Sequence, residues 1–166
     1  MLLRRLSIVL AFLMVPAVAS ADAHRAGAFG GGSFLKASTI TGVHVSGEYG
    51  PFDHTKFKGV TVLADFSCHF LGKHDGSDDN VKTTLFGGGY EYPIGDHIFT
   101  VRGLVGDSIG EGTAKAVGGS WEWVLHRLEP GWQKGFRVQV DHIFLNDIDD
   151  AWRISVGGVI RYKRRP

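Results

Sequence analysis

The segment that decides the fold is Val60–Phe70, VTVLADFSCHF, in which apolar and mostly polar residues alternate. One parity carries valine, alanine, phenylalanine and cysteine, and the other carries Thr61, Leu63, Asp65, Ser67 and His69. A period of two is that of an extended strand with two different faces. The segment is also long enough to cross a bilayer as a tilted strand. It therefore predicts a strand, and leaves open whether the apolar face meets a protein core or lipid.

The N-terminus predicts export from the cytoplasm. Arg4 and Arg5 precede the apolar run Leu6–Val15, and small residues follow, which is the pattern of a secretory signal peptide over residues 1–21. Cleavage as late as residue 23 fits the same pattern. We expect a short leader over 22–27 and one domain over 28–166. The chain has 1 cysteine and a net charge of +1, which excludes an internal disulfide and argues against a nucleic-acid partner.

The rest of the chain repeats the pattern of the first segment. Strand-like stretches alternate with turn signals such as Gly50-Pro51, Pro93 and Pro130-Gly131. The expected strands cover 31–38, 42–49, 60–70, 81–92, 98–107, 113–124, 136–145 and 152–163. Their regular spacing predicts an all-β protein in which eight antiparallel strands form an up-and-down barrel.

The polar faces of these strands carry acids and bases in nearly equal number. A buried charge is costly unless it is paired, and the interior of an eight-stranded barrel is just wide enough for side chains to fill it. We therefore expect a structural network of paired charges in the lumen. Its members are Glu48, Asp65, Glu91, Arg102, Glu122, Arg137, Asp141, Arg153 and Arg161.

Alternation alone does not separate a membrane barrel from a soluble barrel of inverted polarity. Three features favour a barrel in lipid. The strands are long for a soluble protein, aromatic residues gather toward the strand ends, and the polar faces are balanced rather than rich in lysine and glutamate. His142, which falls on an apolar face, is a cost to this interpretation.

Three stretches carry a family resemblance: residues 59–67 (GVTVLADFS), 84–90 (TLFGGGY) and 152–162 (WRISVGGVIRY). With them the chain resembles small bacterial outer-membrane β-barrel proteins of the eight-stranded, single-domain OmpA-like transmembrane type. The resemblance implies periplasmic termini, outer loops at 72–80, 108–112 and 146–150, and periplasmic turns at 93–96 and 128–135.

The same resemblance implies two partners. One is outer-membrane lipid, and the other is the barrel-assembly machinery, which reads a last strand ending on an aromatic residue. Strand 152–162 ends on Tyr162, but Lys163-Arg164-Arg165-Pro166 follow it, which departs from the family pattern.

Two groups of residues have side chains that could carry out catalysis or bind a metal. Ser67, His69 and Asp65 share one strand face, but alternate residues of a strand lie about 7 Å apart, too far for the contacts of a catalytic triad. The acidic stretch 75–80 lacks the sixth-position glycine and distal glutamate of a calcium loop. The sequence therefore assigns no catalytic, metal-binding or cofactor-binding residue.

The expected function is that of a non-enzymatic outer-membrane barrel, closed by paired charges, that contributes to envelope integrity or surface interactions. Three alternatives remain open. They are a narrow, ion-conducting porin-like barrel, an outer-membrane lipid-modifying enzyme, and a soluble periplasmic lipocalin-like barrel that binds an apolar ligand.

Overall fold

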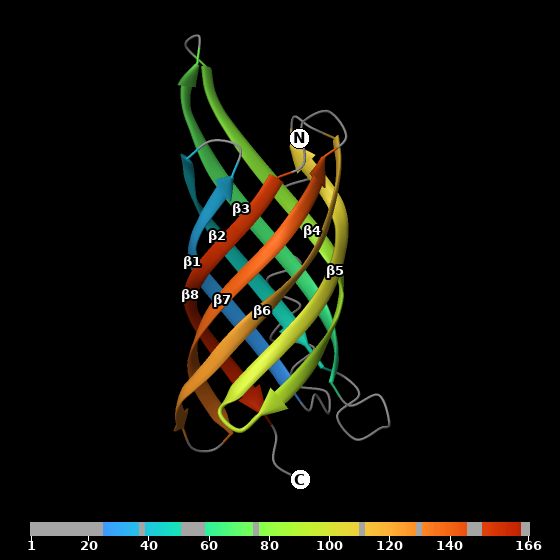
Figure 1. Ribbon diagram of the computed structural model, residues 1–166, viewed down its shortest axis with the longest axis vertical. Coiled ribbons are helices and arrows are strands. Elements are labelled where there is room, and N and C mark those ends of the chain that lie inside the picture. Colours follow the sequence, from blue (N-terminus) through green and yellow to red (C-terminus); the bar gives the residue numbers. More distant parts are fainter. Residues whose placement is uncertain are drawn as a thin grey trace, which may run out of the picture.

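The described residues form eight antiparallel strands that close into a barrel (Figure 1). The computed structural model describes residues 25–36, 39–50, 59–74, 77–109, 112–128, 131–145 and 151–163, so the expected signal peptide lies outside the described residues. The strands are β1 (Arg25–Lys36), β2 (Thr39–Tyr49), β3 (Val60–His74), β4 (Ser77–Ile94), β5 (His97–Ile109), β6 (Gly112–Leu128), β7 (Trp132–Leu145) and β8 (Ala151–Lys163). This confirms the predicted all-β, up-and-down barrel.

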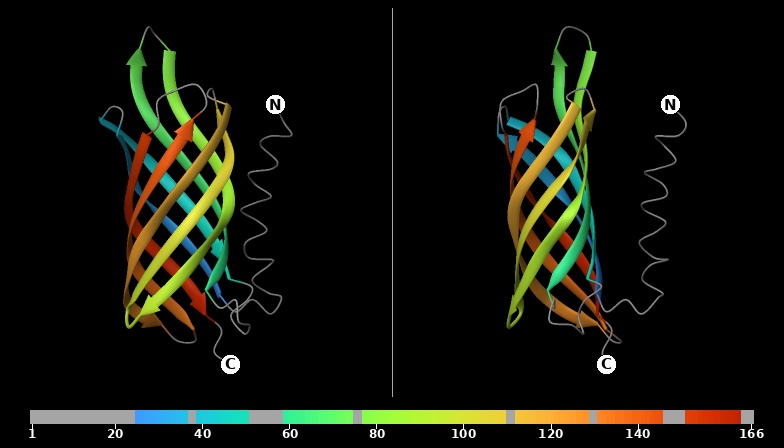
Figure 2. Two further views of the ribbon diagram at one scale, coloured as in Figure 1. Left: turned by 45° about the vertical axis from the view of Figure 1, so that its right-hand side comes forward. Right: turned by 90° about the vertical axis from the view of Figure 1, so that its right-hand side faces the viewer.

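Each strand pairs with its neighbours in sequence, and β1 closes the barrel against β8. The strands are strongly tilted from the long axis of the barrel (Figure 2). We call the end of the barrel with the β4–β5 and β6–β7 turns the lower mouth, because it lies at the bottom of Figure 1. Among the described residues, no helix is long and apolar enough to cross a membrane.

The first strand begins earlier than predicted, and part of the expected leader is wrong. Arg25, Ala26 and Gly27 belong to β1, where Ala26 pairs with Tyr49 of β2 and with Tyr162 of β8. Glycines conceal this strand in the sequence, because they interrupt the alternation. One of them leaves room for a buried carboxylate, since a Cβ on Gly27 would lie 2.4 Å from Oε1 of Glu48 and would displace that side chain.

The strands also extend further than predicted at both ends of the barrel. The expected loop 72–80 is mostly strand, since the backbone of Lys73 pairs with Asp78 and that of His74 with Ser77. This hairpin continues past its neighbours and projects from the upper end (Figure 1). Polar residues concealed it, because polarity marks an exposed strand as readily as a loop.

The other predicted connections are shortened in the same way. Ser108 pairs with Gly112 across the expected loop 108–112, and Leu128 pairs with Trp132 within the expected turn 128–135. Glycines with positive φ make two of the lower turns possible, at Gly95 (61°) and Gly131 (93°), because the left-handed region strongly favours glycine.

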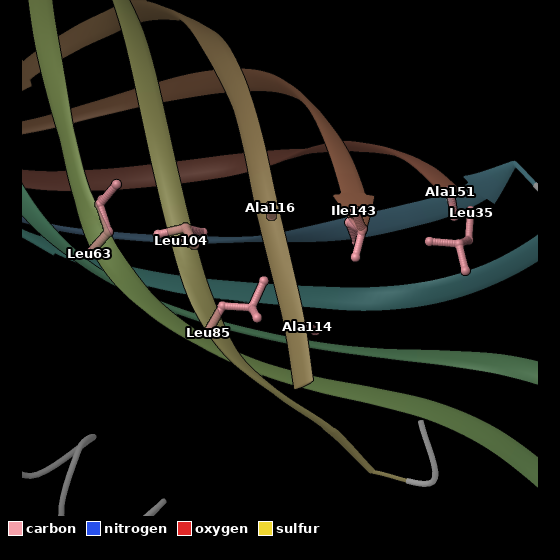
Figure 3. Packing of buried hydrophobic residues seen from close by; sticks show 8 residues of the cluster. All are labelled: Leu35, Leu63, Leu85, Leu104, Ala114, Ala116, Ile143 and Ala151. Atoms are coloured by element: carbon pink, nitrogen blue, oxygen red, sulfur yellow. The ribbon is translucent and has the colours of Figure 1, made fainter. Parts of the chain in front are cut away.

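Side chains alternate between a polar interior and an apolar exterior. In β8 the burial pattern runs buried, exposed, buried, exposed from Ala151, so that Arg153 and Ser155 point inward while Trp152 and Ile154 point outward. The interior also holds an apolar cluster (Figure 3). Its members are Leu35, Leu63, Leu85, Leu104, Ala114, Ala116, Ile143 and Ala151.

Candidate functional site

The candidate site is the charged interior of the barrel. All nine residues predicted for the lumen lie inside it, and none has more than 5% of its surface exposed. The strands bring them together from distant parts of the chain; Arg137 and Glu48, for example, are 89 residues apart. The nine residues fall into two groups at different heights in the barrel.

The first group is the Arg153 cluster, which comprises Asp65, Arg102, Asp141, Arg153 and His44. The Arg153 guanidinium lies between two carboxylates, with NH1 2.8 Å from Oδ1 of Asp65 and NH2 2.8 Å from Oδ2 of Asp141. Arg102 binds the second carboxylate in a bidentate manner, at 2.8 and 2.6 Å. Nε2 of His44 is 2.7 Å from Oδ2 of Asp65. Such charge-assisted pairs are the strong hydrogen bonds of proteins.

Hydroxyl and amide groups extend the Arg153 cluster upward and across the lumen. NH1 of Arg153 donates to the Ser67 hydroxyl at 3.0 Å, and that hydroxyl also bonds Thr83 at 2.6 Å. Gln139 donates to Asp141 at 3.1 Å. A separate series of hydrogen bonds runs through Ser33. Its hydroxyl oxygen is 3.1 Å from the Ser155 hydroxyl oxygen and 2.9 Å from Nε2 of His69.

The second group is the Arg161 cluster, which lies nearer the lower mouth. It consists of Arg25, Glu48, Glu91, Glu122, Arg137 and Arg161. Arg161 contacts all three glutamates, at 2.8 Å from Glu48, 3.0 Å from Glu91 and 2.7 Å from Glu122. Arg137 bridges Glu48 and Glu122, each at 2.8 Å.

Each cluster is balanced in formal charge. Two arginines face two aspartates in the first, if its histidine is neutral, and three arginines face three glutamates in the second. Phe29 lies between the clusters, with its ring 5.1 Å from that of His44 and 5.5 Å from Cζ of Arg137. The interior therefore holds, besides its apolar cluster, two neutral networks joined through an aromatic ring.

The three residues weighed as a catalytic triad make separate contacts. Among the described residues, Ser67, His69 and Asp65 form no hydrogen bond with one another; they bond Thr83, Ser33 and His44 respectively. All three are at most 3% exposed, so the arrangement offers no open nucleophile. The side chains of the acidic stretch 75–80 lie outside the described ones.

Sequence reasoning missed two participants. His44 was not among the residues predicted for the lumen network, and Arg25 was assigned to the leader. The parity of β2 was the available signal for His44, since it shares a face with Glu48. Nothing in the glycine-rich sequence around Arg25 indicated that it contacts Glu91, at 2.6 Å.

The exterior carries the aromatic residues at the two ends of the strands. Near the lower mouth, Tyr90, Tyr92, Trp123 and Trp132 are all at least 45% exposed. Near the upper end, His142 points outward and its ring packs edge-on against Phe144 at 4.5 Å and Trp152 at 4.7 Å. The histidine that opposed the membrane interpretation thus lies within an aromatic group at one end of the barrel.

Comparison with solved structures finds a match to the crystal structure of Neisserial surface protein A (NspA). The match has a TM-score of 0.50 and 12% sequence identity, and it covers 84% of this chain and 94% of that one. At this level of identity, the match shows that the two chains share a fold, and nothing more. No protein-family model and no curated protein matches the sequence.

Proposed function

We propose that this protein is a non-enzymatic outer-membrane barrel of the OmpA-like type, with a closed lumen, that contributes to envelope integrity or surface interactions. The observation that carries the proposal is the inverted polarity of the molecule. Two networks of paired charges are buried inside the barrel, and many of its large apolar residues are exposed on the outer face. The fold shared with a Neisserial surface protein supports the same location.

The exterior supports a lipid environment. Exposed valines, such as Val101 at 69% and Val105 at 59%, occupy strand positions between the aromatic ends. An apolar band flanked by aromatic residues is the pattern of transmembrane barrels. In water, a continuous apolar surface of this kind would be an aggregation or interaction surface.

The interior supports a closed structural barrel rather than a pore or a ligand carrier. A conducting path needs water along the axis, whereas both clusters fill the lumen with buried side chains. A carrier of apolar ligands needs an open apolar cavity, whereas the charged clusters occupy much of the interior and the apolar residues there are themselves packed together. These features favour the closed barrel over the porin-like and lipocalin-like alternatives.

The orientation follows from the proposed class. With periplasmic termini, the lower mouth faces the periplasm and the projecting β3–β4 hairpin faces outward, where it is available for surface interactions. β8 supplies the insertion signal for the assembly machinery, with Tyr162 as its aromatic residue.

Fractionation and heat-modifiability test the location. The barrel is expected to pellet with outer membranes, to require detergent for release, and to migrate differently on a gel when it is not boiled. Release by osmotic shock without detergent contradicts the proposal.

A pair of arginine substitutions tests which face meets lipid. Val101→Arg, whose neighbours across the sheet are Tyr90 and Gly119, is expected to cost about 2–4 kcal/mol of folding free energy in lipid vesicles, whereas Ile94→Arg at the lower turn costs about 1 kcal/mol or less. Both side chains are more than half exposed, so neither substitution disturbs the interior. Urea unfolding in vesicles measures the difference. Equal effects at the two positions would contradict a bilayer around the barrel.

A further inference from the structure

A cavity opens at the lower mouth, where three members of the Arg161 cluster, Arg25, Glu91 and Arg161, line it. Its volume is about 180 Å³. A single buried water needs about 10–15 Å³ of such space, so the cavity has room for a group much larger than water. Its walls come from the lower ends of β1 and of β4 to β8, together with Gly95 in the β4–β5 turn.

The charges that line this cavity are unequal. Arg25, Arg127, Arg161 and Lys163 contribute four cations, and Glu91 contributes the single carboxylate. That carboxylate already accepts from two guanidinium groups, with NH1 of Arg25 at 2.6 Å and NH1 of Arg161 at 3.0 Å. At the floor of the cavity, the carboxylate of Glu91 is therefore paired with Arg25 and Arg161. The cations that could donate hydrogen bonds to a ligand lie at the rim.

Two rim cations are available to a ligand. Lys163 has no carboxylate partner among the described residues. Arg127 pairs with Asp96 at 2.5 Å, but both side chains are about 60% exposed, and an ion pair so open to water contributes little. Gln133 adds an amide to the same wall.

We propose that this cavity binds a phosphate-type oxyanion that enters from the aqueous phase at the lower mouth. Lysine and arginine donate charge-assisted hydrogen bonds to phosphate oxygens. A concave wall of one sign also concentrates anions more than a flat surface does. Two sources present this chemistry there: free phosphate, and the headgroup of a phospholipid beside the rim.

The experiment uses the whole barrel in a phosphate-free maltoside detergent. Inorganic phosphate is titrated while the backbone amide shifts of Gln133 and Lys163 are followed by NMR, with sodium chloride at equal ionic strength as the reference. A saturable shift at both amides with phosphate, and none with chloride, is the expected result.

Three variants test whether the rim cations bind the phosphate. Lys163→Gln is expected to weaken phosphate binding about fivefold, the upper end of what an exposed ion pair contributes. Asp96→Asn is expected to strengthen binding, because it releases Arg127 from its present partner. Lys134→Gln is the matched control: this exposed lysine lies on β7 and lines no part of the cavity, so affinity is expected to be unchanged.

A second arm separates the two sources. Micelles doped with phosphatidylglycerol replace inorganic phosphate in the same titration. A response to phosphate supports a soluble ligand, and a response to the lipid alone supports a headgroup. Absence of both responses overturns the proposal, as does a response that Lys163→Gln and Lys134→Gln weaken equally. Because all three substituted side chains are exposed, gel migration without boiling verifies that the variants still fold.

Discussion

At the scale of the residue, the interior is held by arginines that each bridge several carboxylates. Arg153 has no exposed surface and binds Asp65, Asp141 and Ser67. A buried ion pair is weak evidence of stability, since desolvation offsets the Coulomb attraction, but removal of one partner leaves the other charge buried. The dependence of the fold on these groups therefore shows most clearly when a single cation is removed.

Arg153→Met is expected to destabilise the barrel by about 3–5 kcal/mol, because two buried aspartates lose their shared guanidinium. Arg127→Met is the matched control, since it removes an arginine from an exposed pair and is expected to cost about 1 kcal/mol or less. Urea unfolding in lipid vesicles measures both. Similar losses in the two variants would mean that the buried network contributes no more than a surface ion pair.

The sequence predicted which charged residues lie in the lumen, but not which residues they pair with. Parity within a strand assigns a face, and Glu48, Asp65 and Arg137 were placed by this rule alone. The partner of each depends on barrel closure and on the stagger between strands, which parity within one strand does not contain. For the same reason the contact between His44 and Asp65 was not predicted.

At the scale of the element, β1 and β8 pair through two inward glycines, Gly31 and Gly157. A Cβ on Gly157 would lie 2.2 Å from the carbonyl oxygen of Gly30, and one on Gly31 would lie 2.2 Å from that of Val156. Neither contact leaves room for a side chain. The next residue, Gly158, faces outward, and a Cβ there would meet nothing within 4 Å.

Gly157→Ala is expected to destabilise the barrel by about 1–3 kcal/mol, because overpacking must separate the two strands that close it. Gly158→Ala is expected to change stability by about 0.5 kcal/mol or less, since its methyl group enters open space. The adjacent positions make the comparison independent of strand propensity. Chemical denaturation of the two variants under identical conditions decides the matter, and equal losses would refute the close-packing explanation.

The errors in strand boundaries share one physical cause. Periodicity identifies a strand only where one face is apolar, as in β3 and β8. Where both faces are polar, as around Lys73 and Asp78, or where glycine occupies the inner face, as at Gly27, the backbone pairing continues while the sequence signal ends. The pairing is then fixed by the neighbouring strand rather than by the residues themselves.

At the scale of the whole molecule, closure was predictable because every strand needs a partner on both edges. The sequence predicts eight long strands and, within the expected domain, no second sheet or helix to cover their edges; a barrel removes the edges altogether. The division of the interior into two neutral clusters was not predictable, because it depends on the height at which each charge lies. That height follows from the tilt and stagger of the closed barrel.

The closed interior predicts an electrically silent barrel. Two neutral clusters, linked by Phe29, place buried guanidinium and carboxylate groups across the lumen, so an ion entering from either end meets paired side chains instead of water. Purified protein in a planar lipid bilayer is expected to produce no discrete conductance steps, while a wider porin reconstituted in the same way provides the positive control. Gel migration of protein recovered from the same vesicles verifies that it was folded and inserted. Reproducible openings that persist in such a sample would mean that the clusters rearrange to admit ions, and the closed-lumen function would then give way to the porin-like one.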